Sequence, residues 1–189
     1  MARQLSTVYC VMIAAITLLP EAHSKVYETT YDAHRELALT KRYYLQYRSY
    51  RDDYAVQEAA KCVSLVVMNI ALLVVGNAIL FYKPTLQSPL KNKQVRIRTH
   101  KAPGSRSVVD TMMRITDADT GRQLYDLTLQ YTDYRTCRVL VQQFAHTRQC
   151  SLWVIPERRG GVIPALCSQA YTDICGGGRH QIDIPGSCP

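Results

Sequence analysis

The sequence predicts an all-β protein with flanking helices, built as an antiparallel sandwich or barrel. Short runs in which apolar and polar residues alternate recur from Lys93 onward, as expected for strands with one buried face. Residues with turn chemistry separate these runs at Pro103-Gly104, Asp119-Thr120-Gly121 and Gly160-Gly161. Five of the seven cysteines lie between Cys137 and Cys188, which indicates an oxidising compartment and a fold held by disulfides.

The N-terminus has the layout of a secretory signal peptide. Arg3 precedes an apolar run of roughly 15 residues, and Ala22-His23-Ser24 places small residues at the two positions that a signal peptidase reads. We therefore predict a signal peptide over residues 1–24 and one domain over residues 25–189. Its removal also removes Cys10. The six remaining cysteines fit three disulfides, for which the sequence alone leaves about 15 pairings open.

A short amphipathic helix is predicted before the first strand. Thr30 suits the N-cap, and Ala33, Leu37 and Leu39 recur at near-helical spacing. Tyrosines then follow at positions 43, 44, 47, 50 and 54. Each tyrosine combines a large apolar ring with a polar tip. Two interpretations of this stretch stay open: an ordinary mixed surface and core, or a strand that lines a ligand cavity.

Residues 63–82 carry no charge, and this run admits two interpretations. It is long enough for a transmembrane helix, and the basic residues that follow it resemble those on the cytosolic side of a span. It is also rich in valine and isoleucine and contains Gly76-Asn77, which suits a hairpin turn between two buried strands. We predict strands, because a span here would place the later cysteines in the cytosol, where disulfides rarely persist.

Further strands and one more helix complete the predicted domain. The alternating runs are Val95–Thr99, Val109–Ile115, Tyr125–Tyr131, Cys137–Gln142 and Ser151–Ile155. After them, Pro164 suits a first helical turn and Gly176 a helix stop. Between these two residues, Cys167 and Cys175 recur on one helical face, so we expect disulfides to fasten this helix to the sheet. Residues 176–189 show no regular pattern.

Signals of catalysis, metal binding and nucleic-acid binding are weak. The net charge of +8 is spread along the chain without a nucleic-acid motif. The histidines lack metal-ligand spacing, and no Gly-x-Ser-x-Gly motif or phosphate loop occurs. Residues 117–121 read Asp-Ala-Asp-Thr-Gly, which fits a hairpin turn better than a calcium loop. We therefore predict no enzyme activity, metal or cofactor, and no nucleic-acid partner.

Several segments of the mature chain share residues and spacing with one known family. They are Tyr47-Arg48-Ser49-Tyr50-Arg51-Asp52-Asp53, Lys61-Cys62-Val63, Tyr131-Thr132-Asp133-Tyr134-Arg135-Thr136-Cys137, Cys150-Ser151-Leu152-Trp153-Val154, Pro164-Ala165-Leu166-Cys167 and Cys188. In these segments the chain resembles tick salivary lipocalins of the histamine-binding type. The resemblance implies an eight-stranded antiparallel up-and-down lipocalin (calycin) barrel with a short N-terminal helix and a C-terminal helix. It also implies the disulfides Cys62–Cys188, Cys137–Cys167 and Cys150–Cys175.

The same resemblance implies a function. Such proteins are secreted in saliva and sequester small host mediators, so we expect a biogenic amine such as histamine in the barrel cavity, to blunt host defence. Tyr50 and Asp53 match positions where amine binders carry a tyrosine and an aspartate, and Trp153 matches an aromatic position of the ligand motif. Arg138 and Ser151 depart from the family pattern, which has acids at both places.

These departures keep other ligands open. A buried ammonium needs a nearby carboxylate, so an amine would depend on Asp53. Arg138 could instead pair with the carboxylate of a fatty acid or a leukotriene. A third interpretation is a complement-type evasion factor that binds a host protein. The predicted ligand-binding residues are thus Tyr50, Asp53, Trp153 and Arg138, in a mature chain without a membrane span.

Overall fold

The computed structural model describes residues 30–56, 59–71, 75–144 and 147–189. The predicted signal peptide, residues 1–24, lies outside this part of the chain. The described elements are α2 (Ala33–Ala38), β1 (Arg42–Arg48), β2 (Lys61–Ala71), β3 (Val75–Lys83), β4 (Lys91–His100), β5 (Met112–Asp117), β6 (Gln123–Thr132), β7 (Cys137–Phe144), β8 (Thr147–Val154), the 3-10 helix η1 (Pro156–Arg158), α3 (Ala165–Cys175) and β9 (His180–Gln181). In these ranges, no helix has both the length and the apolar character that a membrane crossing requires.

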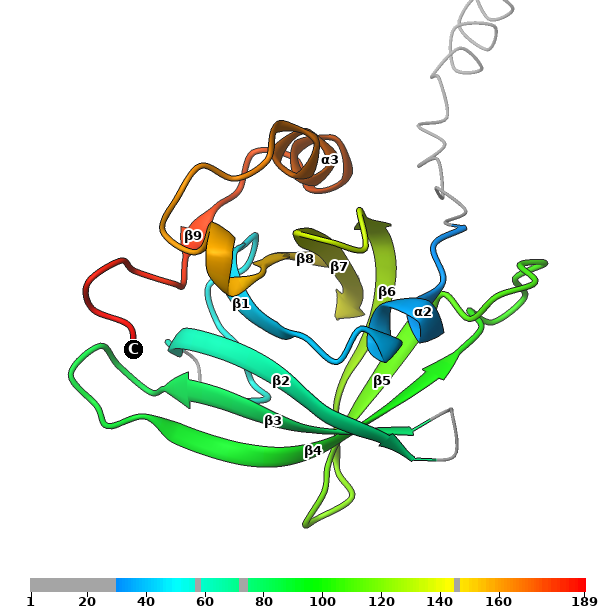
Figure 1. The fold of residues 1–189 in the computed structure, drawn as a ribbon, viewed down its shortest axis with the longest axis horizontal. Helices are drawn as coiled ribbons and strands as arrows, with labels where there is room; N and C mark the ends of the chain where they lie inside the picture. The colour runs from blue at the N-terminus through cyan, green and yellow to red at the C-terminus, as the bar shows by residue number, and fades with distance from the viewer. Residues whose placement is uncertain (1–29, 57–58, 72–74, 145–146) are drawn as a thin grey trace, which may run out of the picture.

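Eight antiparallel strands close into an up-and-down barrel (Figure 1). Each strand from β2 to β7 pairs with the next one along the chain, and β1 closes the ring between β8 and β2. The short strand β9 pairs with the end of β1, where Tyr47 lies opposite Gln181. The predicted eight-stranded barrel with two flanking helices is confirmed. Strand β9 is a correction, since the sequence showed no regular pattern after residue 176.

The uncharged run of residues 63–82 forms two paired strands, as predicted, because β2 and β3 pair along most of their length. The position of the turn differs from the prediction. Gly76 and Asn77 lie inside β3, opposite Ile70 and Asn69. A side chain at Gly76 would begin 3.1 Å from the Leu37 side chain of α2. The glycine therefore lets α2 approach the sheet closely and does not form a turn.

The N-cap residue of helix α2 is Asp32 and not the predicted Thr30. The Asp32 carboxylate accepts hydrogen bonds from the backbone N–H groups of His34 and Arg35, at 2.9 and 3.1 Å, and so satisfies two donors of the first turn. The predicted apolar face is real, because Ala33 and Leu37 are buried in the main core. Helix α2 thereby covers the end of the barrel at which β1 begins.

Alternation along β7 and β8 separates two packed layers. Arg138, Leu140, Ser151 and Trp153 are buried within the barrel, where Leu140 and Trp153 belong to the main core. The neighbouring residues pack on the outer face of the barrel beneath α3, which lies outside the ring in Figure 1. They are Cys137, Val139, Val141, Cys150, Leu152 and Val154. The outer layer explains why these strands are apolar on both faces.

Three disulfides join α3 and the C-terminal tail to the barrel. Cys137 on β7 bonds Cys167, and Cys150 on β8 bonds Cys175, so both ends of α3 are fastened to neighbouring strands. Cys62 on β2 bonds Cys188, which ties the C-terminal segment across the barrel wall. These are the three pairings that the resemblance implied.

Smaller features also differ from the sequence predictions. Strand β5 begins at Met112, three residues after the predicted start at Val109. Strand β1 ends at Arg48, so Tyr50 and Tyr54 lie in the following loop and not on a strand. Residues 117–121 form the predicted hairpin turn, in which the Asp117 carboxylate accepts hydrogen bonds from the N–H groups of Asp119 and Thr120 at 3.0 Å.

Candidate functional site

A cavity lies inside the barrel. Its described lining consists of Leu45, Tyr50, Asp53, Val63, Leu65, Leu80, Ile115, Tyr125, Leu127, Ser151 and Trp153. Six of these residues are aliphatic, three are aromatic, and Asp53 is the only charged one among them. The centre of a water molecule can reach about 20 Å³ of the cavity, which is roughly the room that one water needs. A larger ligand therefore enters only if lining side chains move.

Asp53 is held at the cavity wall by a dense set of donors. Its side chain is 3% exposed, and Arg48, 1% exposed, donates from Nη1 to Oδ2 at 2.9 Å. The Tyr125 hydroxyl donates to Oδ1 at 2.9 Å, and the backbone N–H of Ala55 donates to the same oxygen at 3.2 Å. Arg48 is itself fixed, because it also donates to the carbonyl oxygens of Tyr50 and Arg51 at 3.1 and 2.6 Å.

Burial controls the ionisation of these groups. Desolvation raises the pKa of Asp53 above its ordinary value, although the Arg48 guanidinium and the Tyr125 hydroxyl both favour the charged carboxylate and oppose the shift. Desolvation also raises the pKa of the Tyr50 and Tyr125 hydroxyls, and the Asp53 charge raises them further. Both phenols therefore stay protonated at neutral pH and can act as hydrogen-bond donors.

Trp153 forms another part of the cavity wall. Its indole Nε1–H donates to Ser151 Oγ at 3.0 Å, and the Ser151 hydroxyl donates to the Leu140 carbonyl at 3.3 Å. Ser151 occupies a position where the resemblance implies an acid. In this chain it fixes the orientation of the indole ring and adds no charge to the cavity. Trp153 is also the only tryptophan of the protein, so its fluorescence reports on this site.

A second buried charge pair lies beyond Trp153, near α2. Arg138 Nη1 lies 3.9 Å from Glu36 Oε1, and both side chains are almost fully buried. The Arg138 guanidinium carbon stands 4.0 Å from the ring centre of Tyr43 and 5.5 Å from that of Trp153. Glu36 Oε2 accepts a hydrogen bond from the Thr132 hydroxyl at 2.8 Å. Desolvation lowers the pKa of Arg138, which Glu36 counteracts.

The predicted site residues are therefore split between two places. Tyr50, Asp53 and Trp153 together line the cavity. Arg138 points into the barrel but lies behind Trp153, outside the lining.

Sequence reasoning missed Arg48, Tyr125 and Glu36 as members of these clusters. Only Tyr125 carried a usable signal, since it alternates in phase with Leu127 and Leu129, which are buried in the core. No pattern in the sequence singled out Arg48 or Glu36 as a buried charge.

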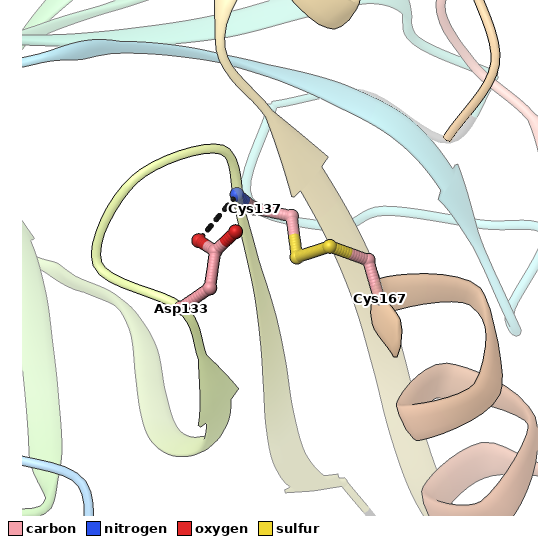
Figure 2. A group of neighbouring side chains, drawn as sticks. All are labelled: Asp133, Cys137 and Cys167. Atoms are coloured by element: carbon pink, nitrogen blue, oxygen red, sulfur yellow. Dashed lines mark hydrogen bonds between the residues drawn. A yellow bond between two sulfur atoms is a disulfide. The ribbon is translucent and has the colours of Figure 1, made fainter. Parts of the chain in front are cut away.

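One group of side chains in the described part of the chain has the composition of a metal site (Figure 2). It contains Asp133, Cys137 and Cys167. The two sulfurs are bonded to each other, so neither is a thiolate ligand. The Asp133 carboxylate accepts hydrogen bonds from the N–H groups of Arg135, Thr136 and Cys137 at 2.7–3.0 Å. This group shapes the turn between β6 and β7, and its donor set does not fit a metal ion.

Comparison with known proteins matches this geometry to one family. A sequence model of the family described as "tick histamine binding protein" matches residues 21–184. None of the curated protein sequences matches the chain significantly.

Among solved structures, the fold is similar to that of japanin from Rhipicephalus appendiculatus, bound to cholesterol, with a TM-score of 0.58 and 17% identity over 79% of this chain and 95% of that one. A serotonin complex of AM182 is also similar, with a TM-score of 0.57 and 16% identity over 85% of this chain and 94% of that one. Apocrustacyanin C2 has a TM-score of 0.58 and 11% identity over 83% of this chain and 82% of that one. At these identities the likeness concerns the barrel fold.

Proposed function

The chain belongs to the tick histamine-binding protein family, and from that membership we propose that it is a secreted lipocalin that sequesters a small aromatic amine in its barrel. Histamine and serotonin are the ligands we consider first. The role in saliva is to remove such a mediator from the host tissue, by binding it and without chemical change.

The charge of the cavity carries this proposal. Asp53 is the one charged side chain among the described residues of the lining. The Arg48 guanidinium balances this charge at Oδ2 from outside the lining. Of the pair, only the carboxylate faces the cavity, where it can accept a hydrogen bond from an ammonium and disfavours a ligand carboxylate, because like charges repel strongly where water is scarce. The aromatic rings of Tyr50, Tyr125 and Trp153 supply flat apolar surface for an imidazole or an indole.

The Tyr125 hydroxyl is the donor that a ligand ammonium would replace. The other donors to Asp53 include the backbone N–H groups of Ala55 and Val56 and the guanidinium of Arg48, which its bonds to two carbonyl oxygens hold in place. The Tyr125 hydroxyl, by contrast, can move away from Asp53 by rotation of its side chain alone. Its movement would also open space in a cavity that is nearly filled. A charged donor in place of a neutral one strengthens the hydrogen bond to the carboxylate.

A matched ligand series tests the proposal. Histamine, imidazole-4-ethanol and imidazole-4-acetic acid share one ring and differ only in the ammonium, hydroxyl or carboxylate that they carry. We expect the amine to bind about 10- to 100-fold more tightly than the alcohol, and the acid to bind most weakly. Quenching of Trp153 fluorescence and calorimetry measure the affinities.

A parallel series of serotonin, 5-hydroxytryptophol and 5-hydroxyindole-3-acetic acid, measured by calorimetry, extends the test to the larger ring. Tighter binding of the acid than of the amine in both series would contradict the amine proposal. It would support the fatty-acid or leukotriene alternative in its place. A host protein recovered from plasma, with no response to any small ligand, would support the evasion-factor alternative.

The affinity for serotonin is expected to fall in mildly acidic buffer. The ligand ammonium stays charged throughout, so the change reports on the protein. Amine binding needs the Asp53 carboxylate ionised, so it is present above the pKa of Asp53 and is lost as the pH falls through it. Because burial raises that pKa, the loss begins at a higher pH than an ordinary aspartate near 3.8 would give. Calorimetry between about pH 7 and pH 4 measures it. A pH-independent affinity over this range would contradict the role of Asp53.

A further inference from the structure

The guanidinium of Arg138 lies in a cage of the kind that binds organic cations. It stands 4.0 Å from the ring centre of Tyr43 and 5.5 Å from that of Trp153, and the Glu36 carboxylate lies 3.9 Å from Nη1. Aromatic faces attract cations most strongly where water is excluded. A carboxylate beside two such faces supplies both the charge and the shape that an ammonium or a guanidinium requires.

The walls of this cage are held without help from Arg138. Glu36 sits in the first turn of α2, whose start is capped by Asp32, and its Oε2 accepts a hydrogen bond from the Thr132 hydroxyl. Trp153 is oriented by Ser151. Tyr43 comes from β1, which is paired on both sides. A shorter side chain at position 138 would therefore leave a cation site with its carboxylate and aromatic faces in place.

Arg138 occupies the cage but leaves some of its buried polar atoms without good hydrogen bonds. Arg138 Nε is buried and lacks a hydrogen-bond partner among the described residues. Glu36 Oε1 and the Tyr43 hydroxyl have no partner with good hydrogen-bond geometry there, although Tyr43 lies close enough for Glu36 to raise its pKa. The 3.9 Å between the guanidinium and the carboxylate is also too long for a direct hydrogen bond. A buried charge pair with loose geometry recovers little of the free energy lost on desolvation. An optimised structural ion pair would be closer and fully bonded.

We propose that Arg138 is the resident cation of a carboxylate–aromatic cage formed by Glu36, Tyr43 and Trp153, and that it closes this end of the barrel to organic cations. The cage takes small guanidinium and alkylammonium ions once the arginine side chain is removed. If the proposed amine function holds, Arg138 also limits the protein to one amine per barrel, bound at Asp53. The cage itself does not depend on that function.

Chemical complementation of Arg138→Ala tests the cage. Methylguanidinium replaces the deleted head group, and N-methylurea is its neutral counterpart of the same shape. We expect methylguanidinium, at about 100 times its dissociation constant, to raise the melting temperature of Arg138→Ala by about 5–10 °C relative to sodium chloride of equal ionic strength. N-methylurea should have no such effect. The wild-type protein and the double variant Glu36→Gln/Arg138→Ala should respond to neither.

Equal shifts in Arg138→Ala and the double variant, or no difference between methylguanidinium and N-methylurea, would overturn the proposal. If Arg138→Ala does not fold alone, its refolding yield with and without methylguanidinium decides instead, and equal yields count against the cage. Calorimetry with histamine separates the two proposals. Arg138→Ala should bind two histamine molecules, and Asp53→Asn/Arg138→Ala should bind one, in the cage. If Arg138→Ala binds only one molecule and the double variant keeps it, the result contradicts only the proposed function.

Discussion

Replacement of Asp53 by asparagine is expected to weaken histamine and serotonin binding by about 10- to 100-fold, which corresponds to about 1.5–3 kcal/mol for a hydrogen bond to a charged group. The change removes the one charge of the described cavity lining and keeps the size of the side chain. Binding of imidazole-4-ethanol should stay within about threefold of wild type, since the rings of Tyr50, Tyr125 and Trp153 are untouched. Calorimetry on both ligands measures the difference.

The control for this variant addresses Arg48. Asp53→Asn leaves a buried guanidinium without its carboxylate, which costs about 3–5 kcal/mol of folding stability. The double variant Arg48→Met/Asp53→Asn removes both charges and should recover much of that stability. It should still bind the alcohol and should show the same loss of amine affinity, about 10- to 100-fold. Amine affinity that survives in both variants would rule out Asp53 as the counter-ion.

Loss of the Cys62–Cys188 disulfide is expected to cost more stability than loss of either other bond. The serine pair Cys62→Ser/Cys188→Ser opens a loop that spans 126 residues, which corresponds to roughly 5 kcal/mol in the chain-entropy description. The bond also anchors the tail, where Cys62 N–H donates to the Ile182 carbonyl at 3.0 Å and Ile182 is buried. Denaturation in urea, followed by Trp153 fluorescence, measures the loss.

The matched control is Cys150→Ser/Cys175→Ser. This pair spans only 25 residues and should cost about 3.5 kcal/mol by the same reasoning. A loss in the Cys62→Ser/Cys188→Ser protein that does not exceed the loss in this control would show that loop length does not govern the stability of the barrel.

Much of the fold was predictable because its signals are local. Alternation along β4 follows from one buried face of the strand, and Pro164 and Gly176 do bound α3. Two local signals misled. Thr30 suited a helix cap, but Asp32 has the carboxylate in reach of the first N–H groups. Gly76-Asn77 suited a turn, but the glycine serves the contact with Leu37.

The site was predictable only in part. The resemblance to the tick lipocalin family selected Tyr50, Asp53 and Trp153, and these three residues do meet at one cavity. Some hydrogen-bond partners come from distant parts of the chain: Tyr125 is 72 residues from Asp53, and in the second cluster Thr132 is 96 residues from Glu36. No periodicity in a sequence specifies which of two distant polar groups will share a hydrogen bond.

The sequence by itself determined the secondary structure of the strands and the chemistry available to the cavity. Both depend on side-chain type and local order along the chain. Only the tertiary structure decided which face of β7 is the interior, because alternation distinguishes two faces without saying which one is enclosed. Burial of Cys137 and Val139 under α3 turns Arg138 inward, onto Glu36 and Tyr43. The tertiary structure likewise decided that Asp53 is the charge that faces the cavity. Arg48 lies beside this carboxylate but outside the described lining.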